Sequence, residues 1–307
     1  MNKKNIFSIC VVSYNSEDTI IDTLQSILHQ NYSSKYIELI ISDDASSDNT
    51  KELIKTWEKQ HRKYFYKIKL NIEKKNNGLV NNINKACKLA TSEWIKPIAA
   101  DDILMEDCIS KFNEFICINK NACCIFCKVQ TFNHNSLLHV KPQNNYLYNL
   151  SYQKQFYELL IDNFIFAPSL LIKKETLEKF NFFDSAYKNM EDYPLWLKLT
   201  INHIKLSFLD ETLIMYRVHD NSLSKKNFLL NEQTNKDVIK CKKFYLNKIQ
   251  KNTIMYFLLS IDIYLFNLSS QLKIKLLKNK KNKITLFIGV LPRFFSPLFL
   301  IRKLKSL

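Results

Sequence analysis

Two patterns of apolar and polar residues alternate along the first hundred positions, one typical of strands and the other of helices. Four short segments have the composition of sheet strands, three of them as continuous apolar runs: 6–12, 36–42, 66–73 and 94–100. The segments between them repeat apolar residues every three or four positions, the spacing of one helix face: 16–30, 48–60 and 76–93. We expect Ser16 to be the N-cap of the first helix. Strands that alternate with helices of this length predict βαβ units and a mainly parallel sheet.

The second half of the chain has a less regular pattern. It predicts a helix at 105–119, a strand at 122–132, a strand entering a helix at 164–180, a helix at 190–201 and a strand pair within 204–218. From residue 225 onward the pattern is helical and rich in both lysine and apolar residues. This region differs in composition from everything before it, which indicates a separate helical extension.

Pro97 lies inside the strand expected at 94–100. Proline cannot donate a ladder hydrogen bond and is therefore rare in the middle of a sheet. We expect a bulge or an unpaired position at this point of the strand.

Polar clusters follow three of the expected strands. They are Ser13-Tyr14-Asn15, Asp43-Asp44 and Asp101-Asp102. In open parallel sheets, ligands bind beyond the carboxyl ends of the strands. The three clusters are therefore expected to converge on one crevice.

The adjacent carboxylates of Asp101 and Asp102 repel each other unless something stabilises both. Neighbouring residues of a strand point to opposite faces, so the chain must turn here for both to face one ligand. Mg²⁺ or Mn²⁺, which is often held by one or two carboxylates plus substrate phosphates, is one candidate. The alternative is that the pair caps the helix expected near Met105. Asp43 and Asp44 leave the same choice open, between contacting a nucleoside and capping a helix.

Composition narrows the classes of function. Gly78 and Gly289 are the only glycines, so the glycine-rich loops of dinucleotide-binding and P-loop proteins are absent. The formal charge of +16 is concentrated at one end, because residues 221–307 carry 18 Lys and Arg against 3 Asp and Glu. A nearly neutral body with a basic tail indicates an anionic partner for the tail.

Two apolar stretches in the tail, 253–268 and 284–301, are flanked by basic residues. Each is marginal as a bilayer span, and the pattern suits an interfacial element on an anionic cytoplasmic leaflet. The alternative is ordinary helices that pack on the catalytic body. Nucleic acid is disfavoured as the partner, because no nucleic-acid-binding motif accompanies the charge.

The eight cysteines and the lack of a cleavable signal pattern favour a reducing cytoplasm with free thiols. Cys124 and Cys127 are followed by His134 and His139, but a four-ligand zinc site usually needs a longer loop between its pairs. Thiols buried in a strand are the better interpretation.

Several motifs occur in an order that resembles the family 2 glycosyltransferases. They are "CVVSYN", "SDDASSDNT", "NNGLVNNINKA", "AADDIL", "MEDYPLW" and "YRVHDNS". The resemblance implies the GT-A fold, a Rossmann-like, mostly parallel α/β sheet flanked by helices. It places a catalytic domain at 1–224, with a nucleotide-binding half at 1–104 and an acceptor half at 105–224, before the basic helical extension at 225–307.

The resemblance also implies roles for individual residues. Nucleotide or donor-sugar contacts fall on Val12, Ser13, Tyr14, Asp43, Asp44, Asn77, Gly78, Leu79, Asn84 and Asp101. Asp102 and His219 are expected to hold Mn²⁺ or Mg²⁺. Asp192 is expected to be the catalytic base, with Glu191 beside it. For this pair the alternative is a favourable charge at a helix N-terminus.

The sequence departs from the family pattern at three positions. Ala99 stands where the first Asp of a D-x-D motif is usual, Ile83 where a basic residue is common, and Asn181 where glycine is frequent.

The expected activity is inverting, metal-dependent transfer of a sugar, from a UDP-sugar in preference to other nucleotide donors, to a glycan or lipid-linked acceptor. Bacterial O-antigen, capsule or lipooligosaccharide synthesis at the inner face of the cell membrane is the expected setting. A non-catalytic sugar-nucleotide-binding scaffold and a nucleotidyltransferase are the alternatives. The second lacks the glycine-rich N-terminal loop that its class requires.

Overall fold

The computed structural model describes residues 4–133, 136–187, 190–218, 230–280 and 283–305. The chain divides into two compact units. The first comprises Met1–Tyr152 and Ile165–Arg217, and the second Gln153–Phe164 and Val218–Leu307.

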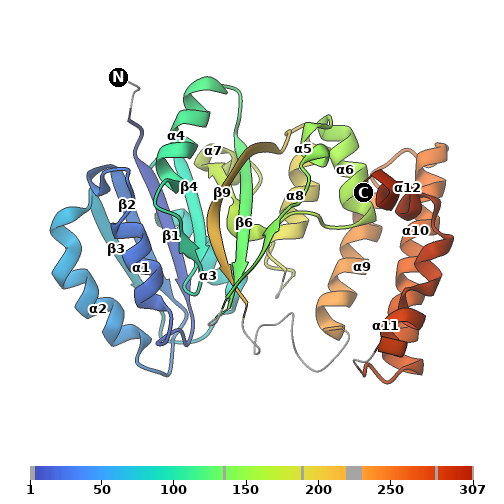
Figure 1. Ribbon diagram of the computed structural model, residues 1–307, viewed down its shortest axis with the longest axis horizontal. Helices are drawn as coiled ribbons and strands as arrows, with labels where there is room; N and C mark the ends of the chain where they lie inside the picture. The colour runs from blue at the N-terminus through green and yellow to red at the C-terminus, as the bar shows by residue number, and fades with distance from the viewer. Residues whose placement is uncertain (1–3, 134–135, 188–189, 219–229, 281–282, 306–307) are drawn as a thin grey trace. The chain divides into compact units, whose positions relative to one another are not determined.

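The first unit is built on one mixed sheet (Figure 1). Its strands are β1 Phe7–Ser13, β2 Ile37–Asp43, β3 Lys67–Ile72, β4 Trp94–Ala99, β5 Ile103–Leu104, β6 Cys124–Phe132, β7 Leu137–Lys141, β8 Leu171–Lys173 and β9 Ser207–Arg217. They are ordered β3-β2-β1-β4-β8-β6-β9-β5, and β7 pairs with the edge of β6. The first four run parallel, whereas β8 is antiparallel to both β4 and β6.

Helices connect and flank these strands. They are α1 Ile20–Leu28, α2 Thr50–His61, α3 Leu79–Leu89, α4 Cys108–Ile118, α5 Tyr146–Asn149, α7 Lys174–Lys179 and α8 Asp192–Ile201. All seven residues of β1 and of β2 are buried, which agrees with their apolar composition. The predicted α/β class, a mostly parallel sheet flanked by helices, is confirmed for this unit.

Pro97 lies at a position of β4 that pairs with a neighbouring strand on one side and is unpaired on the other. β1 pairs along the strand, with Cys10 opposite Pro97, whereas β8 pairs only with Trp94 and Ile95. The expected unpaired position is therefore present on the β8 side. The buried Lys96 ammonium donates to the carbonyls of Pro97 (2.9 Å) and Pro168 (2.5 Å). The ammonium thus supplies hydrogen bonds to carbonyls near the point where β4 and β8 no longer pair. Burial lowers the pKa of the Lys96 ammonium.

Two local predictions were wrong, and one strand was missed. The strand pair expected within 204–218 is the single strand β9, which pairs with β6 in parallel and with β5 in antiparallel fashion. β7 was not predicted. Helix α1 begins at Ile20 with Thr19 as its N-cap residue, and Ser16 lies a turn earlier, where its carbonyl accepts from Thr19 and Ile20.

The second unit is helical. It contains most of α6 Tyr152–Ile161, together with α9 Glu232–Leu246, α10 Ile254–Gln271, the π-helix η4 Leu272–Leu276, α11 Lys283–Val290, the 3₁₀ helix η5 Leu291–Phe295 and α12 Pro297–Lys305. The buried Lys242 donates to the Ile161 carbonyl (2.8 Å), and the buried Asp262 accepts from Ser296 (2.6 Å). Across the described helices, none is both long and apolar enough to cross a bilayer.

Candidate functional site

The parallel register brings the three predicted polar clusters to one edge of the sheet. Ser13 is opposite Asp43, and Val12 is opposite Ala99, so the segments after β1, β2 and β4 begin side by side. The Ala100 N–H donates to the Val12 carbonyl (3.0 Å), which extends this contact beyond the end of β4. The predicted convergence of the strand ends is present in the structure.

Asp43 is fully buried and shapes the loop that follows β2. Its Oδ1 accepts from the Ser13 hydroxyl (3.0 Å) and from the Ser46 hydroxyl (2.5 Å). Its Oδ2 accepts from the Ser46 N–H (2.9 Å). The carboxylate therefore fixes the turn at 43–46, and this role accounts for its position without a nucleotide.

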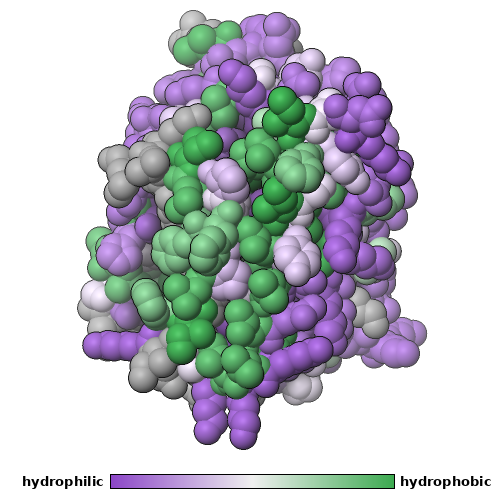
Figure 2. Space-filling model, turned by 90° about the vertical axis from the view of Figure 1, so that its right-hand side faces the viewer, coloured by the Kyte–Doolittle hydropathy of each residue, from purple (hydrophilic) through white to green (hydrophobic). Residues whose placement is uncertain are grey.

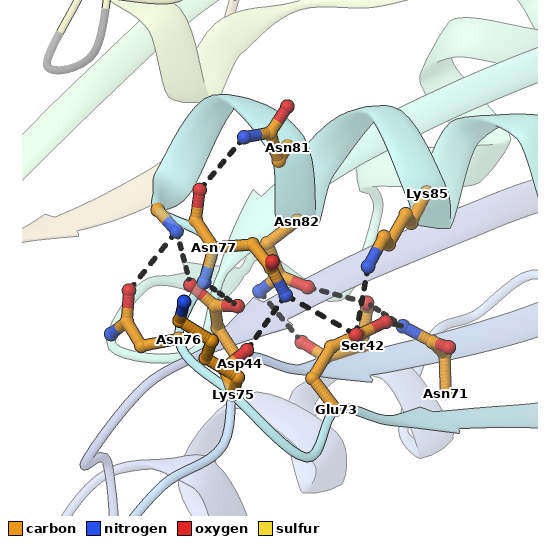
Figure 3. A network of polar contacts seen from close by, with 11 residues as sticks. Ser42, Asp44, Asn71, Glu73, Lys75, Asn76, Asn77, Asn81, Asn82 and Lys85 are labelled. Atoms are coloured by element: carbon orange, nitrogen blue, oxygen red, sulfur yellow. Dashed lines mark hydrogen bonds and ion pairs between the residues drawn. The ribbon is translucent and has the colours of Figure 1, made fainter.

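Asp44 holds the loop that leads into α3 (Figure 3). Oδ1 accepts from the Asn77 N–H (2.8 Å) and Oδ2 from the Gly78 N–H (2.7 Å). Gly78 has φ +86°, a conformation that side chains with a Cβ rarely adopt, so glycine is needed at this turn. Asp44 thus positions Asn77 and Gly78, the residues predicted to lie near the donor. A direct contact between Asp44 and a base stays a prediction.

A polar network that sequence reasoning missed continues from this loop (Figure 3). Asn82 on α3 accepts from the Ser42 hydroxyl and donates to the Ser13 and Ser42 carbonyls. Glu73 accepts from Asn77 and pairs with Lys85 at 2.7 Å. Asparagine and serine in a helix and a strand carry no special sequence signal. Only the folded sheet shows that these groups tie α3 to the strand ends.

Asn84 is engaged by a loop of the acceptor half. Its Nδ2 donates to the Phe183 carbonyl (2.8 Å), and its Oδ1 accepts from the Phe183 N–H (3.0 Å). The side chain lies on the wall of a polar cavity of about 600 Å³, which Asn77, Lys88 and Lys198 also line. The structure gives Asn84 a positioning role, and its predicted contact with the donor sugar remains untested.

Tyr14 has a ring available for stacking, because half of its surface (51%) is exposed directly after β1. By contrast, Val12 and Ser13 are buried, and the Ser13 carbonyl accepts from the Asp44 N–H and the Asn82 amide. Of these three predicted nucleotide contacts, Tyr14 therefore presents the most accessible surface.

Asp101 and Asp102 lie in the turn that the sequence predicted after β4. The Asp102 N–H donates to the Ala99 carbonyl (3.2 Å), and the Asp102 carboxylate, only 1% exposed, accepts from the Arg217 N–H (3.0 Å). Helix α4 begins at Cys108 with Asp107 as its N-cap residue. The alternative in which the pair caps this helix is therefore wrong.

Arg217, at the end of β9, was not singled out from the sequence. Its Nε donates to the Asp101 carbonyl (2.9 Å), and its Nη2 pairs with Asp22 on α1 (2.9 Å). The guanidinium also lies over the Phe132 ring, 4.7 Å from the centroid. Arg217 thus holds the Asp101-Asp102 turn through both its backbone and its side chain.

The carboxylates of this turn are electrostatically unfavourable as they stand. Burial, followed by the charge of Asp101, raises the pKa of Asp102 well above its usual range. A divalent cation would relieve this repulsion, and carboxylates with donor phosphates are suitable ligands. No group of three or more His, Cys, Asp or Glu side chains within the described ranges forms a metal site. His219, the other predicted ligand, lies outside the described residues.

Glu191 and Asp192 stand at the start of α8. Glu191 occupies the N-cap position, but its side chain makes no cap hydrogen bond. Burial and then the neighbouring charge of Asp192 raise the pKa of Glu191 to about 7. The predicted alternative, a favourable charge at a helix N-terminus, describes the place of Asp192 in the first turn of α8. It does not account for the raised pKa of Glu191, which is typical of carboxylates at functional sites.

Tyr216 on β9 connects the two acidic pairs. Its pKa is raised to about 12, first by burial and then by the charges of four carboxylates. These are Asp102, Asp101, Glu191 and Asp192, in decreasing order of effect. All four must therefore lie within electrostatic reach of one hydroxyl. The predicted metal carboxylate and the predicted base thus both contribute to the electrostatic surroundings of Tyr216.

Comparison with known proteins places this geometry in context. The profile described as Glycosyl transferase family 2 matches residues 8–180. An uncharacterized glycosyltransferase of Methanocaldococcus jannaschii is 26% identical over 92% of this chain and 97% of its own. A UDP-Glc:alpha-D-GlcNAc-diphosphoundecaprenol beta-1,3-glucosyltransferase of Escherichia coli is 27% identical over 73% of this chain and 81% of its own.

Two solved structures share the fold. Staphylococcus aureus TarS 1–349 in complex with UDP has a TM-score of 0.63 at 18% identity, covering 88% of this chain and 75% of that one. A mannosyltransferase of Pyrobaculum calidifontis in complex with GDP-Man and Mn²⁺ has a TM-score of 0.60 at 14% identity, covering 98% and 75%. The predicted GT-A architecture is confirmed.

Proposed function

The chain belongs to glycosyl transferase family 2, and from that premise we propose that it moves a sugar from a UDP-sugar to a hydroxyl of a glycan or lipid-linked acceptor, with inversion at the anomeric carbon. The setting we propose is bacterial surface polysaccharide synthesis. The setting is supported by a relative of Bacillus subtilis named as a putative teichuronic acid biosynthesis glycosyltransferase, and the lipid-linked acceptor by the diphosphoundecaprenol in the name of the E. coli glucosyltransferase.

The observation that carries the proposal is the pair of acidic groups around Tyr216. Asp101 and Asp102 come from the end of β4, and Glu191 and Asp192 come from the start of α8. Both pairs raise the pKa of the same hydroxyl, although more than eighty residues separate them in the chain. Inverting transfer needs one group for the leaving diphosphate and another for the acceptor proton, and the two acidic pairs are our candidates for these roles.

In the proposed step, Asp192 accepts the proton of the acceptor hydroxyl. The acceptor oxygen forms its bond to the anomeric carbon while the bond from that carbon to the diphosphate oxygen breaks. The electron pair of the broken bond leaves with the nucleoside diphosphate. Attack from the opposite face inverts the centre, and protein, donor and acceptor balance without another reactant.

Asp102, with Asp101 beside it, is the group in the described chain that would hold a divalent cation. When bound, Mn²⁺ or Mg²⁺ would offset the charge of the departing diphosphate. Two structures of this fold, the mannosyltransferase and a GalNAc-transferase, contain Mn²⁺, and this supports a cation of the same kind here. Asp102 keeps its orientation through the Arg217 N–H in either case.

The donor end of the site is formed by Tyr14 and by the loop that Asp44 holds. The exposed Tyr14 ring can stack on a planar base, and the Asn77-Gly78 turn lies next to the same sheet edge. The E. coli relative is named for UDP-Glc and TarS holds UDP, which supports uridine, whereas the mannosyltransferase of the same fold holds GDP-Man.

A non-catalytic sugar-nucleotide-binding protein is the second candidate. It is favoured by Ala99 and Ile83, which replace polar or charged residues usual in the family. The raised pKa of Glu191 speaks against it, because carboxylates with raised pKa values are typical of catalytic sites.

Donor turnover distinguishes the two candidates. We expect slow UDP-sugar hydrolysis with Mn²⁺ and its loss in Asp192→Asn, by about 10³-fold, with donor affinity nearly unchanged. Asp210→Asn on β9, an exposed carboxylate paired with Lys128, is the control. Lost donor binding with residual turnover in Asp192→Asn would contradict the assignment of the base.

A further inference from the structure

The helical second unit exposes an unusual number of large apolar side chains. Thirteen between Phe244 and Ile301 are exposed by 37% or more: Phe244, Ile254, Phe257, Tyr264, Leu268, Leu276, Leu286, Phe287, Leu291, Phe294, Phe295, Leu300 and Ile301. Figure 2, turned toward the side on which α10, α11 and α12 lie in Figure 1, shows apolar residues gathered in a continuous band with hydrophilic residues on both sides. We call these thirteen residues the apolar face.

Helix α10 shows that this exposure is systematic. Ile254, Phe257, Tyr264 and Leu268 follow one another at intervals of three, seven and four residues, so they form one stripe along the helix. The opposite side of α10 is already covered within the unit, where Leu259, Asp262 and Ile263 are buried. The helix is thus apolar on the side that its own unit leaves open.

The neighbouring elements extend the stripe. α10 packs against η5, α11 and α12. These elements expose Leu286 and Phe287 on α11, Phe294 and Phe295 on η5, and Leu300 and Ile301 on α12. Contiguous apolar surface on several packed elements marks an interaction site rather than scattered exposed residues.

Exposed lysines outnumber exposed acidic residues in the described part of the second unit, where the exposed acids are Asp162 and Glu232. Lys248 and Lys251 precede α10, and Lys275, Lys278, Lys280 and Lys283 lie between η4 and α11, all exposed. The acidic residues of the described part of 230–301 are Glu232, Asp237 and Asp262, and the last two are buried. The surface is therefore complementary to an anionic partner that also has an apolar interior.

A lipid bilayer with anionic headgroups has both properties. A second copy of the chain does not fit as well, because a two-fold contact through this face would bring the two lysine groups together. We infer that the apolar face inserts in the plane of an anionic membrane surface, with the aromatic and aliphatic side chains among the acyl chains and the lysines at the phosphates. The proposal is independent of the sugar donor and of the transfer step.

Vesicle co-sedimentation of the full chain tests the inference. Vesicles of phosphatidylglycerol and phosphatidylethanolamine should bind the protein, and phosphatidylcholine vesicles should bind it far more weakly. The paired change Phe257→Ser and Phe295→Ser should lower the affinity by about 30-fold or more, because two exposed rings (64% and 76%) no longer insert. Ile118→Ser, at an 81% exposed apolar position of the first unit, is the matched control and should not change binding.

The charge contribution is tested separately. Lys251→Gln together with Lys278→Gln should weaken binding to anionic vesicles by about tenfold or more, and added salt should do the same to the unchanged protein. Circular dichroism and the melting temperature show whether each variant is folded. If the paired phenylalanine variant does not fold, Ile254→Ser, at an 80% exposed position, replaces it.

Three results would overturn the inference. One is the absence of binding to anionic vesicles by the unchanged protein, and another is equal binding by the Phe257/Phe295 variant and its parent. The third is a dimer, seen by light scattering, that the same phenylalanine changes dissociate without any vesicle binding. UDP-sugar hydrolysis in vesicle-free buffer should be the same in all these variants, so the failure of one proposal does not imply failure of the other.

Discussion

Two groups of acidic residues in the first unit have opposite surroundings. Asp43 and Asp44 accept hydrogen bonds from backbone N–H groups and hydroxyls of the adjoining loops. In the second group, Asp102 is buried and Glu191 is half-buried beside the like charges of Asp101 and Asp192, and their pKa values rise.

The difference separates carboxylates that hold loops in place from carboxylates proposed to act in the transfer reaction. The hydrogen bonds that Asp43 and Asp44 accept hold their loops in place. Asp102 also accepts a backbone N–H bond, from Arg217, but burial and the charge of Asp101 outweigh it. Carboxylates that repel one another gain from a cation, a proton or a positively polarised substrate. The first group should therefore affect folding and donor placement when it is changed, and the second should affect turnover more than folding.

The largest effect is expected from Asp102→Asn. The amide oxygen can still accept from the Arg217 N–H, so the turn should keep its shape, but the negative charge for a cation is lost. We expect Mn²⁺-dependent turnover to fall by about 10³-fold or more. Metal titrations of UDP-sugar hydrolysis measure this, with Asp210→Asn as control. An unchanged Mn²⁺ dependence would remove Asp102 from the metal site.

Asp44→Ala should act on stability. It leaves the Asn77 and Gly78 N–H groups without their carboxylate acceptor. We expect the free energy of unfolding to fall by about 2–3 kcal/mol, measured by urea denaturation. The control is Glu114→Ala on α4, where the carboxylate lies 4.0 Å from the Lys111 ammonium. This change should alter the free energy of unfolding by less than about 0.5 kcal/mol. A stable Asp44→Ala protein that only loses donor affinity would place Asp44 with the second group.

Glu191→Gln should alter the pH dependence of stability. Because the pKa of Glu191 is about 7 in the folded chain against 4.5 ordinarily, the folded state binds more protons than the unfolded one between these values. Stability therefore falls as pH rises from about 4.5 to 7. We expect the variant to exceed the wild type by about 1–2 kcal/mol above pH 7, a value reduced for partial exposure, and to match it below 4.5.

Metal-free urea denaturation between pH 4 and 8 measures this difference. Asp210→Asn should show no such pH-dependent gain. An equal free energy of unfolding for the Glu191→Gln variant and the wild type at all pH values would show that the two carboxylates at the start of α8 do not repel each other.

The smallest effect is expected at Tyr14. Replacing its exposed ring in Tyr14→Ala should raise the KM for the donor by about five- to tenfold, because stacking on a base contributes about 1 kcal/mol. Tyr14→Phe keeps the ring and should change KM by less than about twofold. A larger loss in Tyr14→Phe would assign the contact to the hydroxyl instead.

Local patterns predicted what depends on local sequence. The apolar runs gave the parallel strands β1, β2 and β4, and the Asp101-Asp102 pair indicated a turn after β4. The resemblance to a family supplied Glu191 and Asp192, which no periodicity identifies as a functional pair.

What depends on distant partners could not be predicted. Arg217 holds Asp102 across 115 positions of sequence, and Asn84 holds Phe183 across 99. The Thr19 hydroxyl donates to the Ala100 carbonyl and accepts no N–H bond from its own helix, so the capping rule that pointed to Ser16 failed. These contacts exist only once the sheet has brought the segments together.

Arg217 is also the last residue of the sheet unit, and the chain continues from it into the helical one. A chimera that exchanges the C-terminal helices with those of another family member should be spliced after residue 224, the predicted end of the catalytic domain. A junction upstream of Arg217 would remove the peptide that orients Asp102, and one directly after it would remove the predicted metal ligand His219. A junction after residue 224 keeps both groups, so the helices could be exchanged without altering the residues proposed for transfer.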